Sequence, residues 1–164
     1  VLFAKAGKRT LIIDTNFYRE TIAATFNCNS KPGIAEVLTG VIPEDAAVQT
    51  TSVADLSVIS AGEMLARPSE MFESSKFSKL LESMRAHFDV IILDTPPLSL
   101  TNDAAVLCGL SDELLLVVEC HKHSLDSIRD GLNLLTRDKP LLKKAVVLNK
   151  YRFLKTERQE GKEG

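Results

Sequence analysis

The chain has 164 residues, of which 45% are hydrophobic and 26% charged, and its formal net charge is −2. This balance is typical of one globular domain with a single core, and it offers no basic surface for a nucleic acid. The 3 cysteines are widely separated, which excludes a disulfide framework and a C-x-x-C metal site, and no apolar run approaches the roughly 20 residues of a membrane span.

Alternating strands and helices are predicted from the N-terminus onward. The expected strands are 10–14, 56–60, 90–94, 113–120 and 144–149, and the expected helices are 33–38, 75–88, 102–110 and one that begins after Ser124. This alternation is typical of an α/β fold with a mostly parallel sheet flanked by helices. A single domain is expected over residues 1–154, followed by a charged and disordered tail, 155–164.

Two of the helices have apolar residues at helical spacing. Ser75 is expected to cap the first, and the second is expected to start at Ser124. The inward residues are expected to be Phe77, Leu80, Leu81, Met84 and Phe88 in the first helix, and Leu125, Ile128, Leu132 and Leu135 in the second.

The segment from Phe88 to Leu98 is the most informative part of the sequence. Its unbroken apolar run, 90–93, predicts a strand that is buried on both faces. The run ends at Asp94, because Pro96 and Pro97 cannot donate to a strand ladder. A carboxylate at the end of a buried parallel strand lies where open α/β sheets bind their ligands. The alternative for Asp94 is a helix-capping residue in the following loop.

The segment from Ala6 to Thr10 contains Gly-Lys but is not a phosphate-binding loop. It precedes a strand instead of joining a strand to a helix, so its amides cannot surround a phosphate. Gly7 is expected to end a helix, with Lys8 and Arg9 satisfying that helix end. The sequence contains no G-x-x-x-x-G-K-[ST] loop.

A series of motifs runs through almost the whole chain, from about Ala4 to Asn149. The pieces are Gly7–Asp14, Pro32–Gly40, Leu56–Gly62, Pro68–Phe72, Phe77–Leu81, Asp94–Leu98, Thr101–Ala104 and Val146–Asn149. In this order they resemble the bacterial tyrosine kinases of exopolysaccharide and capsule synthesis, within the deviant-Walker P-loop ATPases. The helix that ends in Leu-Thr-Gly and the following Ser-Ala-Gly strand end are the most specific pieces, since partition and cell-division ATPases share the Asp-Thr-Pro-Pro run.

The resemblance implies a P-loop NTPase fold of the deviant Walker type that lacks its first strand and its P-loop. It also implies Mg²⁺ and ATP as cofactors. Asp94 would hold Mg²⁺ directly or through water, and Asp14 would act near the metal and the incoming hydroxyl.

Other residues take less specific roles from the same resemblance. Asn16, Pro97 and Asn149 are expected to contact the nucleotide, Asn149 at its base, and a plain strand-end turn is the alternative for Asn149. Asp103 is expected to cap a helix, and a place near the metal is its alternative.

The sequence departs from the family pattern in three ways. The phosphate loop is absent, Asn16 stands where the family has a second aspartate, and the tail 155–164 has no tyrosine. The two tyrosines of the chain are Tyr18 and Tyr151. We therefore expect these 164 residues alone neither to bind ATP tightly nor to hydrolyse it.

Three functions are compatible with the sequence. The first is an ATP-dependent protein-tyrosine kinase domain that regulates polysaccharide synthesis and export. It would be cytoplasmic, homo-oligomeric and held at the inner face of the membrane by a membrane-anchored chain-length regulator (a polysaccharide co-polymerase). The second is a catalytically degenerate, nucleotide-binding or scaffold domain on the same partner. A partition or cell-division ATPase is disfavoured, because neither a membrane-targeting helix nor a basic DNA-binding face is visible.

Overall fold

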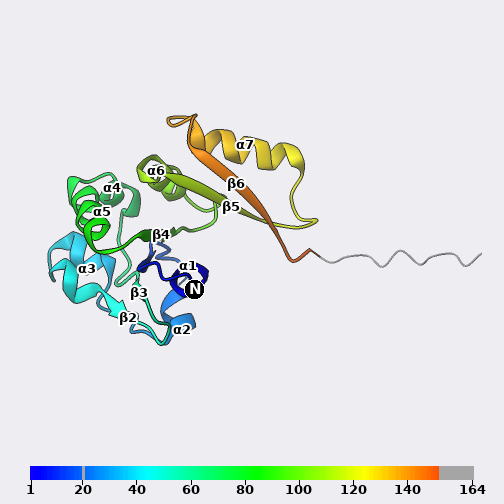
Figure 1. The fold of residues 1–164 in the computed structure, drawn as a ribbon. Helices are drawn as coiled ribbons and strands as arrows, with labels where there is room; N and C mark the ends of the chain where they lie inside the picture. Colours follow the sequence, from blue (N-terminus) through cyan, green and yellow to red (C-terminus); the bar gives the residue numbers. More distant parts are fainter. Residues whose placement is uncertain (20, 152–164) are drawn as a thin grey trace, which may run out of the picture. The chain divides into compact units, whose positions relative to one another are not determined.

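The structure is a computed structural model that describes residues 1–19 and 21–151 (Figure 1). These residues form two compact units, one of residues 1–111 and one that begins at Asp112. The expected disordered tail lies outside the described residues, and the expected domain boundary at 154 stays a prediction.

The first unit is built on a sheet of four strands in the order β2-β3-β1-β4. Strands β3 (Leu56–Ile59), β1 (Thr10–Asp14) and β4 (Val90–Asp94) are parallel, and the short β2 (Gln49–Thr50) pairs antiparallel with β3. The mostly parallel α/β fold is confirmed. The strands at 10–14 and 90–94 have their predicted bounds, and β3 ends one residue earlier than predicted.

Helices cover both faces of this sheet. The helices of the first unit are α1 (Leu2–Lys5), α2 (Ile22–Phe26), α3 (Ile34–Thr39), α4 (Pro68–Phe72), α5 (Ser75–His87) and α6 (Asp103–Leu110), with a 3₁₀ turn, η1 (Glu44–Ala47). Ile12 packs with α1 and α2, while Leu11 and Ile13 pack with α3 to α6. The alternation of Leu11, Ile12 and Ile13 between the faces follows from the two-residue period of a strand.

Helix α5 confirms most of the predicted apolar face. Its buried residues are Phe77, Leu80, Leu81 and Met84, and Phe88 is half-buried at its end. The cap, however, is Ser74 and not Ser75. The Ser74 hydroxyl accepts a hydrogen bond from the Phe77 N–H at 3.4 Å, because the residue just before the first helical position reaches the free N–H groups.

The prediction that β4 is buried on both faces is wrong. Strand β4 is the outer strand of the sheet, and Ile92 at its middle is 36% exposed. The fully buried strand is β1, which lies between β3 and β4. An apolar run predicts a strand in a helix-covered sheet, but the pairing order decides which strand is central.

The second unit contains β5 (Glu113–Glu119), α7 (Leu125–Thr136) and β6 (Lys143–Asn149), close to their predicted positions. The two strands are parallel. The helix starts at Ser124 as predicted, and Ser124 caps it by accepting from the Ser127 N–H at 3.2 Å. Leu125 is 79% exposed and not inward as predicted.

No helix in the part of the chain that the structure describes has both the length and the apolar character that crossing a bilayer requires.

A carboxylate joins α3 to the loop that follows β3. Glu36 Oε2 accepts from the Gly33 N–H at 2.7 Å and Glu36 Oε1 accepts from the Glu63 N–H at 3.0 Å. The Ile34 N–H donates to the Ser60 carbonyl at 2.8 Å. The helix start therefore binds directly to the end of β3, with no space between the two backbones.

Gly33→Ala tests this close approach. An added Cβ would lie 2.5 Å from the Gly62 nitrogen and closer still to the Ser60 carbonyl, so backbone must move. We expect the free energy of unfolding to fall by about 1–3 kcal/mol in urea titrations. Gly109→Ala in α6 is the matched control, because nothing lies within 4 Å of its added Cβ, and it should be neutral or stabilising by about 0.5–1 kcal/mol. Equal effects of the two changes would contradict the close approach of the two backbones.

Candidate functional site

The carboxyl ends of β1 and β4 place two aspartates side by side. Asp14 and Asp94 are register partners in neighbouring parallel strands, which lie about 4.8 Å apart. Thr15 fixes this arrangement, since its N–H donates to the Asp94 carbonyl at 2.9 Å and its hydroxyl donates to the same oxygen at 2.5 Å. The two strands thus end at the same level, at the edge where parallel sheets bind ligands.

The two carboxylates differ in their surroundings. Asp14 is fully buried, and its Oδ1 accepts from the Asn16 N–H at 3.0 Å. Asp94 is half-buried, and burial raises the pKa of its carboxyl above the usual range. A cation beside Asp94 would favour its charged form and offset this desolvation.

The donor set suits a hard divalent cation that keeps part of its water shell. Carboxylate oxygens are the protein ligands that Mg²⁺ prefers, and Mg²⁺ commonly takes only one or two from the protein. The residues that the structure describes contain no group of three or more acidic, histidine or cysteine side chains suited to a metal ion. An ion at Asp14 and Asp94 would therefore complete its shell with water or phosphate oxygens.

Asn16 and Pro97 lie in the loops that follow these two strands. Asn16 Oδ1 accepts from the Tyr18 N–H at 3.3 Å, so its side chain also shapes the turn. Phe17, the residue between Asn16 and Tyr18, is buried and stacks on Phe72 with ring centroids 5.9 Å apart. Pro97 is exposed, and its carbonyl accepts from the Leu100 N–H at 2.9 Å. Four of the predicted site residues, Asp14, Asn16, Asp94 and Pro97, therefore lie on or just after the same two strand ends.

Asn149 belongs to the second unit, where it ends β6. Its carbonyl accepts from the Cys120 N–H at 2.9 Å. Its side-chain oxygen accepts from the Lys150 N–H at 2.8 Å, and Lys150 has a left-handed φ of 57°. Within its own unit Asn149 thus has the bonds of a strand-end turn residue.

The predicted role of Asp103 as the cap of α6 is wrong. The residue at the cap position is Asn102. Asp103 is instead a buried carboxylate whose Oδ1 accepts from the Ser69 hydroxyl of α4. No pattern along the sequence signals a bond between residues 34 positions apart.

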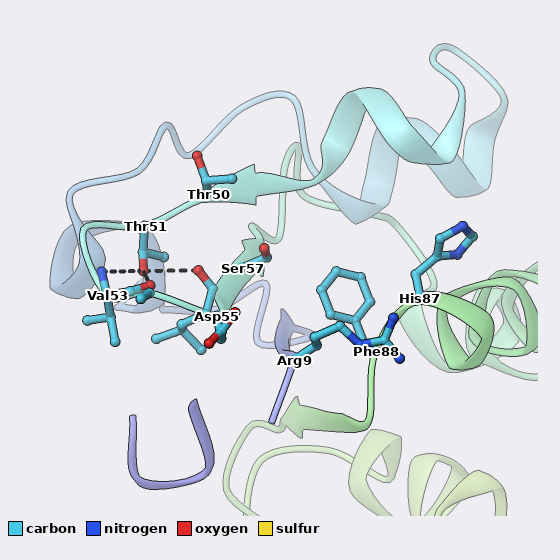
Figure 2. Close-up of a pocket in the computed structure, with 10 residues that line it drawn as sticks. Arg9, Thr50, Thr51, Val53, Asp55, Ser57, His87 and Phe88 are labelled. Atoms are coloured by element: carbon cyan, nitrogen blue, oxygen red, sulfur yellow. Dashed lines mark hydrogen bonds between the residues drawn. The ribbon is translucent and has the colours of Figure 1, made fainter. Parts of the chain in front are cut away.

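A separate pocket of about 350 Å³ lies at the amino ends of β1 and β3, at the opposite end of the strands from the carboxylates (Figure 2). Arg9 lines it and donates to Asp89 from Nε, Nη2 and the backbone N–H, with Nη2 2.7 Å from Oδ1. The expectation that Arg9 satisfies the preceding helix end is wrong, since Asp89 occupies its guanidinium. The lining residues are Arg9, Thr50, Thr51, Val53, Ala54, Asp55, Leu56, Ser57, His87 and Phe88.

Comparison with known proteins adds three findings to this geometry. A family model described as an AAA domain matches residues 1–147. Tyrosine-protein kinase CpsD of Streptococcus pneumoniae serotype 4 is 30% identical over 152 residues, which cover 90% of this chain and 65% of CpsD. The solved BceF tyrosine kinase domain is 31% identical with a TM-score of 0.76, covering 88% of this chain and 58% of that one.

A more distant structure shares the fold alone. The septum site-determining protein MinD of Pyrococcus horikoshii, solved with Mg-ADP, is 17% identical with a TM-score of 0.71, covering 91% of this chain and 60% of that one. The chain spans less than two thirds of the length of the curated relatives that it matches, 65% in the case of CpsD.

The Arg9–Asp89 pair predicts a specific acid dependence of stability. The Arg9 hydrogen bonds lower the pKa of Asp89 from 3.8 to about 2, so this stabilisation is present above pH 3.8 and is lost as the pH falls towards 2. Asp89→Asn should lower the thermal midpoint at pH 6, and its difference from the wild type should shrink through this window. Glu70→Gln, which breaks an exposed pair with Arg67, is the control and should change little. A constant deficit of Asp89→Asn at every pH would contradict this account.

Asp94→Asn is expected to stabilise the metal-free protein at neutral pH. Because burial raises the pKa of Asp94, the wild type loses stability as the pH rises from the unfolded value of 3.8 through the folded value. The uncharged asparagine side chain avoids this loss of stability. In thermal unfolding with a chelator, the variant should therefore have a higher midpoint than the wild type at pH 7, and the same midpoint below pH 3.8. A lower midpoint at pH 7 would show that the charged form is stabilised by the fold.

Proposed function

This chain belongs to the AAA domain family and, within it, to the bacterial tyrosine kinases of capsule and exopolysaccharide synthesis, and from that premise we propose that it is an ATP-dependent protein-tyrosine kinase domain. Its reaction would be transfer of a phosphoryl group from Mg-ATP to a tyrosine hydroxyl. Its role would be to regulate the synthesis and export of an extracellular polysaccharide.

The observation that carries the proposal is the pairing of Asp14 with Asp94 at the carboxyl edge of the sheet. Mg²⁺ with ATP, when bound, supplies the charge neutralisation that phosphoryl transfer requires. Asp94 would hold the ion directly or through water. Asp14, held by the backbone N–H of Asn16, would act beside the ion and orient the incoming hydroxyl.

The nucleotide contacts are proposed for the loops around these aspartates. Asn16 and Pro97 follow the two strand ends and would border the phosphates and the sugar. Asn149 would contact the base. Binding of Mg-ADP by MinD, which shares the fold, supports the same cofactors for this chain.

The partner would be a membrane-anchored chain-length regulator of polysaccharide synthesis. Through it the domain would act in the cytoplasm, at the inner face of the membrane, as part of a homo-oligomer. Membership in the tyrosine kinase family supports this arrangement.

A scaffold without catalysis is the second candidate function. Asn16 supports it, because an amide brings no negative charge to the metal and its oxygen already accepts from the Tyr18 N–H. A scaffold domain would assemble on the same membrane partner without transferring phosphate.

Phosphoryl transfer by the full-length gene product separates the two candidates. We expect micromolar or tighter binding of Mg-ADP by calorimetry and measurable tyrosine phosphorylation. Asp94→Ala and Asp14→Ala should each reduce the transfer rate by about 10²–10³-fold, the usual effect of removing one electrostatic contact to a transition state.

Asp126→Ala is the control, because Asp126 is an exposed residue of α7 that pairs with Arg129 at 3.1 Å, and its rate should match the wild type. Absence of both Mg-ADP binding and transfer in the wild type would reject the kinase and favour the scaffold.

A further inference from the structure

Asp103 is a carboxylate buried inside the first unit. It is the first residue of α6 and is only 1% exposed. Its Oδ1 accepts from the Ser69 hydroxyl, and its Oδ2 is inaccessible and has no hydrogen-bond partner among the described residues. One neutral partner is an unusually small set for a buried carboxylate.

Burying the Asp103 carboxyl costs stability, because one of its two oxygens has no hydrogen-bond partner among the described residues. An asparagine in the same place could still accept from Ser69 and would avoid the desolvation of a charge. A hydrogen bond to an ionised acceptor is, however, about twice as strong as one between neutral groups. The carboxylate therefore gives a stronger tie to Ser69 at the expense of stability.

The loop between Asp94 and Asp103 is tied at both of its ends. At its start, Thr15 donates two hydrogen bonds to the Asp94 carbonyl, at 2.9 and 2.5 Å. At its end, Asp103 binds Ser69 of α4, and the Asp103 N–H donates to the Thr101 hydroxyl at 3.2 Å. Pro97 lies between the two ties. Loss of either tie would free one end of the segment that carries the proposed nucleotide contact.

Ser69 extends the second tie to a third loop of the same edge. Helix α4, which contains Ser69, follows the loop after β3. That loop is itself fixed by Glu36, which accepts from the Glu63 N–H at 3.0 Å. The loops after β1, β3 and β4 are thus joined by hydrogen bonds at the carboxyl edge of the sheet.

We propose that Asp103 is a positioning residue that holds the loop 95–102 through the Ser69 hydroxyl, so that Asp94 and Pro97 keep their places at the ion and the nucleotide. The proposal rests on the proposed function for its effect on rate. Asp103 acts on the loop and not on the metal, because its Oδ1 accepts from Ser69 and its Oδ2 is inaccessible.

The test compares Asp103→Asn and Ser69→Ala with the wild-type, full-length protein. Hydrogen exchange is followed at the amides of Thr95 and of residues 98–102, since Pro96 and Pro97 have no amide hydrogen. The unfolding midpoint and the kcat and KM of phosphoryl transfer are measured as well. Loss of a charge-assisted hydrogen bond should speed exchange in this loop by about tenfold and lower kcat by a similar factor. Asp103→Asn should nevertheless keep or raise the unfolding midpoint, which a purely structural role would lower.

Ser83→Ala is the matched control, because it removes another serine–carboxylate bond, between Ser83 of α5 and Glu44. It should leave exchange in the loop 95–102 unchanged. Wild-type exchange in this loop for both Asp103→Asn and Ser69→Ala would overturn the proposal, as would faster exchange only in parallel with a lower unfolding midpoint.

If the wild type transfers no phosphate, the proposed function fails, and the exchange data alone then support or overturn the positioning role of Asp103. If Ser69→Ala does not fold, Asp103→Asn decides the outcome in the same way.

Discussion

The hydrogen bonds from Thr15 to the Asp94 carbonyl fix the register on which the rest of the site depends. They make β1 and β4 end at the same level, so that Asp14 and Asp94 are direct neighbours. A slip of one residue would turn each side chain of a strand to the opposite face of the sheet and separate the carboxylates. The register is specified strongly, because β1 is fully buried and its two faces pack on different sets of helices.

The remaining loops of this edge are held to the same framework. Glu36 binds the loop after β3, and Asp103 binds the loop after β4 through Ser69. Burial disfavours the charged form of Asp94, and it leaves one oxygen of Asp103 without a hydrogen-bond partner among the described residues. Proteins commonly accept such losses of stability at binding sites. The loops of this edge are thus held to one another by side-chain hydrogen bonds.

Much of the fold could be predicted from sequence, since it depends on local patterns. Apolar runs that end at an aspartate located β1 and β4, and helical spacing located the buried face of α5. The mutual approach of Asp14 and Asp94 followed because parallel strands end at one edge. Local patterns do not specify the order in which the strands pair, so the sequence did not predict the outer position of β4. The bonds of Arg9 to Asp89 and of Ser69 to Asp103 join residues 80 and 34 positions apart, and neither has a local signal.

The central claim is that Asp14 and Asp94 together hold a divalent ion, and paramagnetic broadening by Mn²⁺ tests it most directly. In amide NMR spectra of the protein, substoichiometric Mn²⁺ should first broaden the signals of Thr15, Asn16 and Thr95, which flank the two carboxylates. Asp94→Asn should abolish that selective broadening. Broadening that is centred on other carboxylates, or that persists in Asp94→Asn, would contradict the claim.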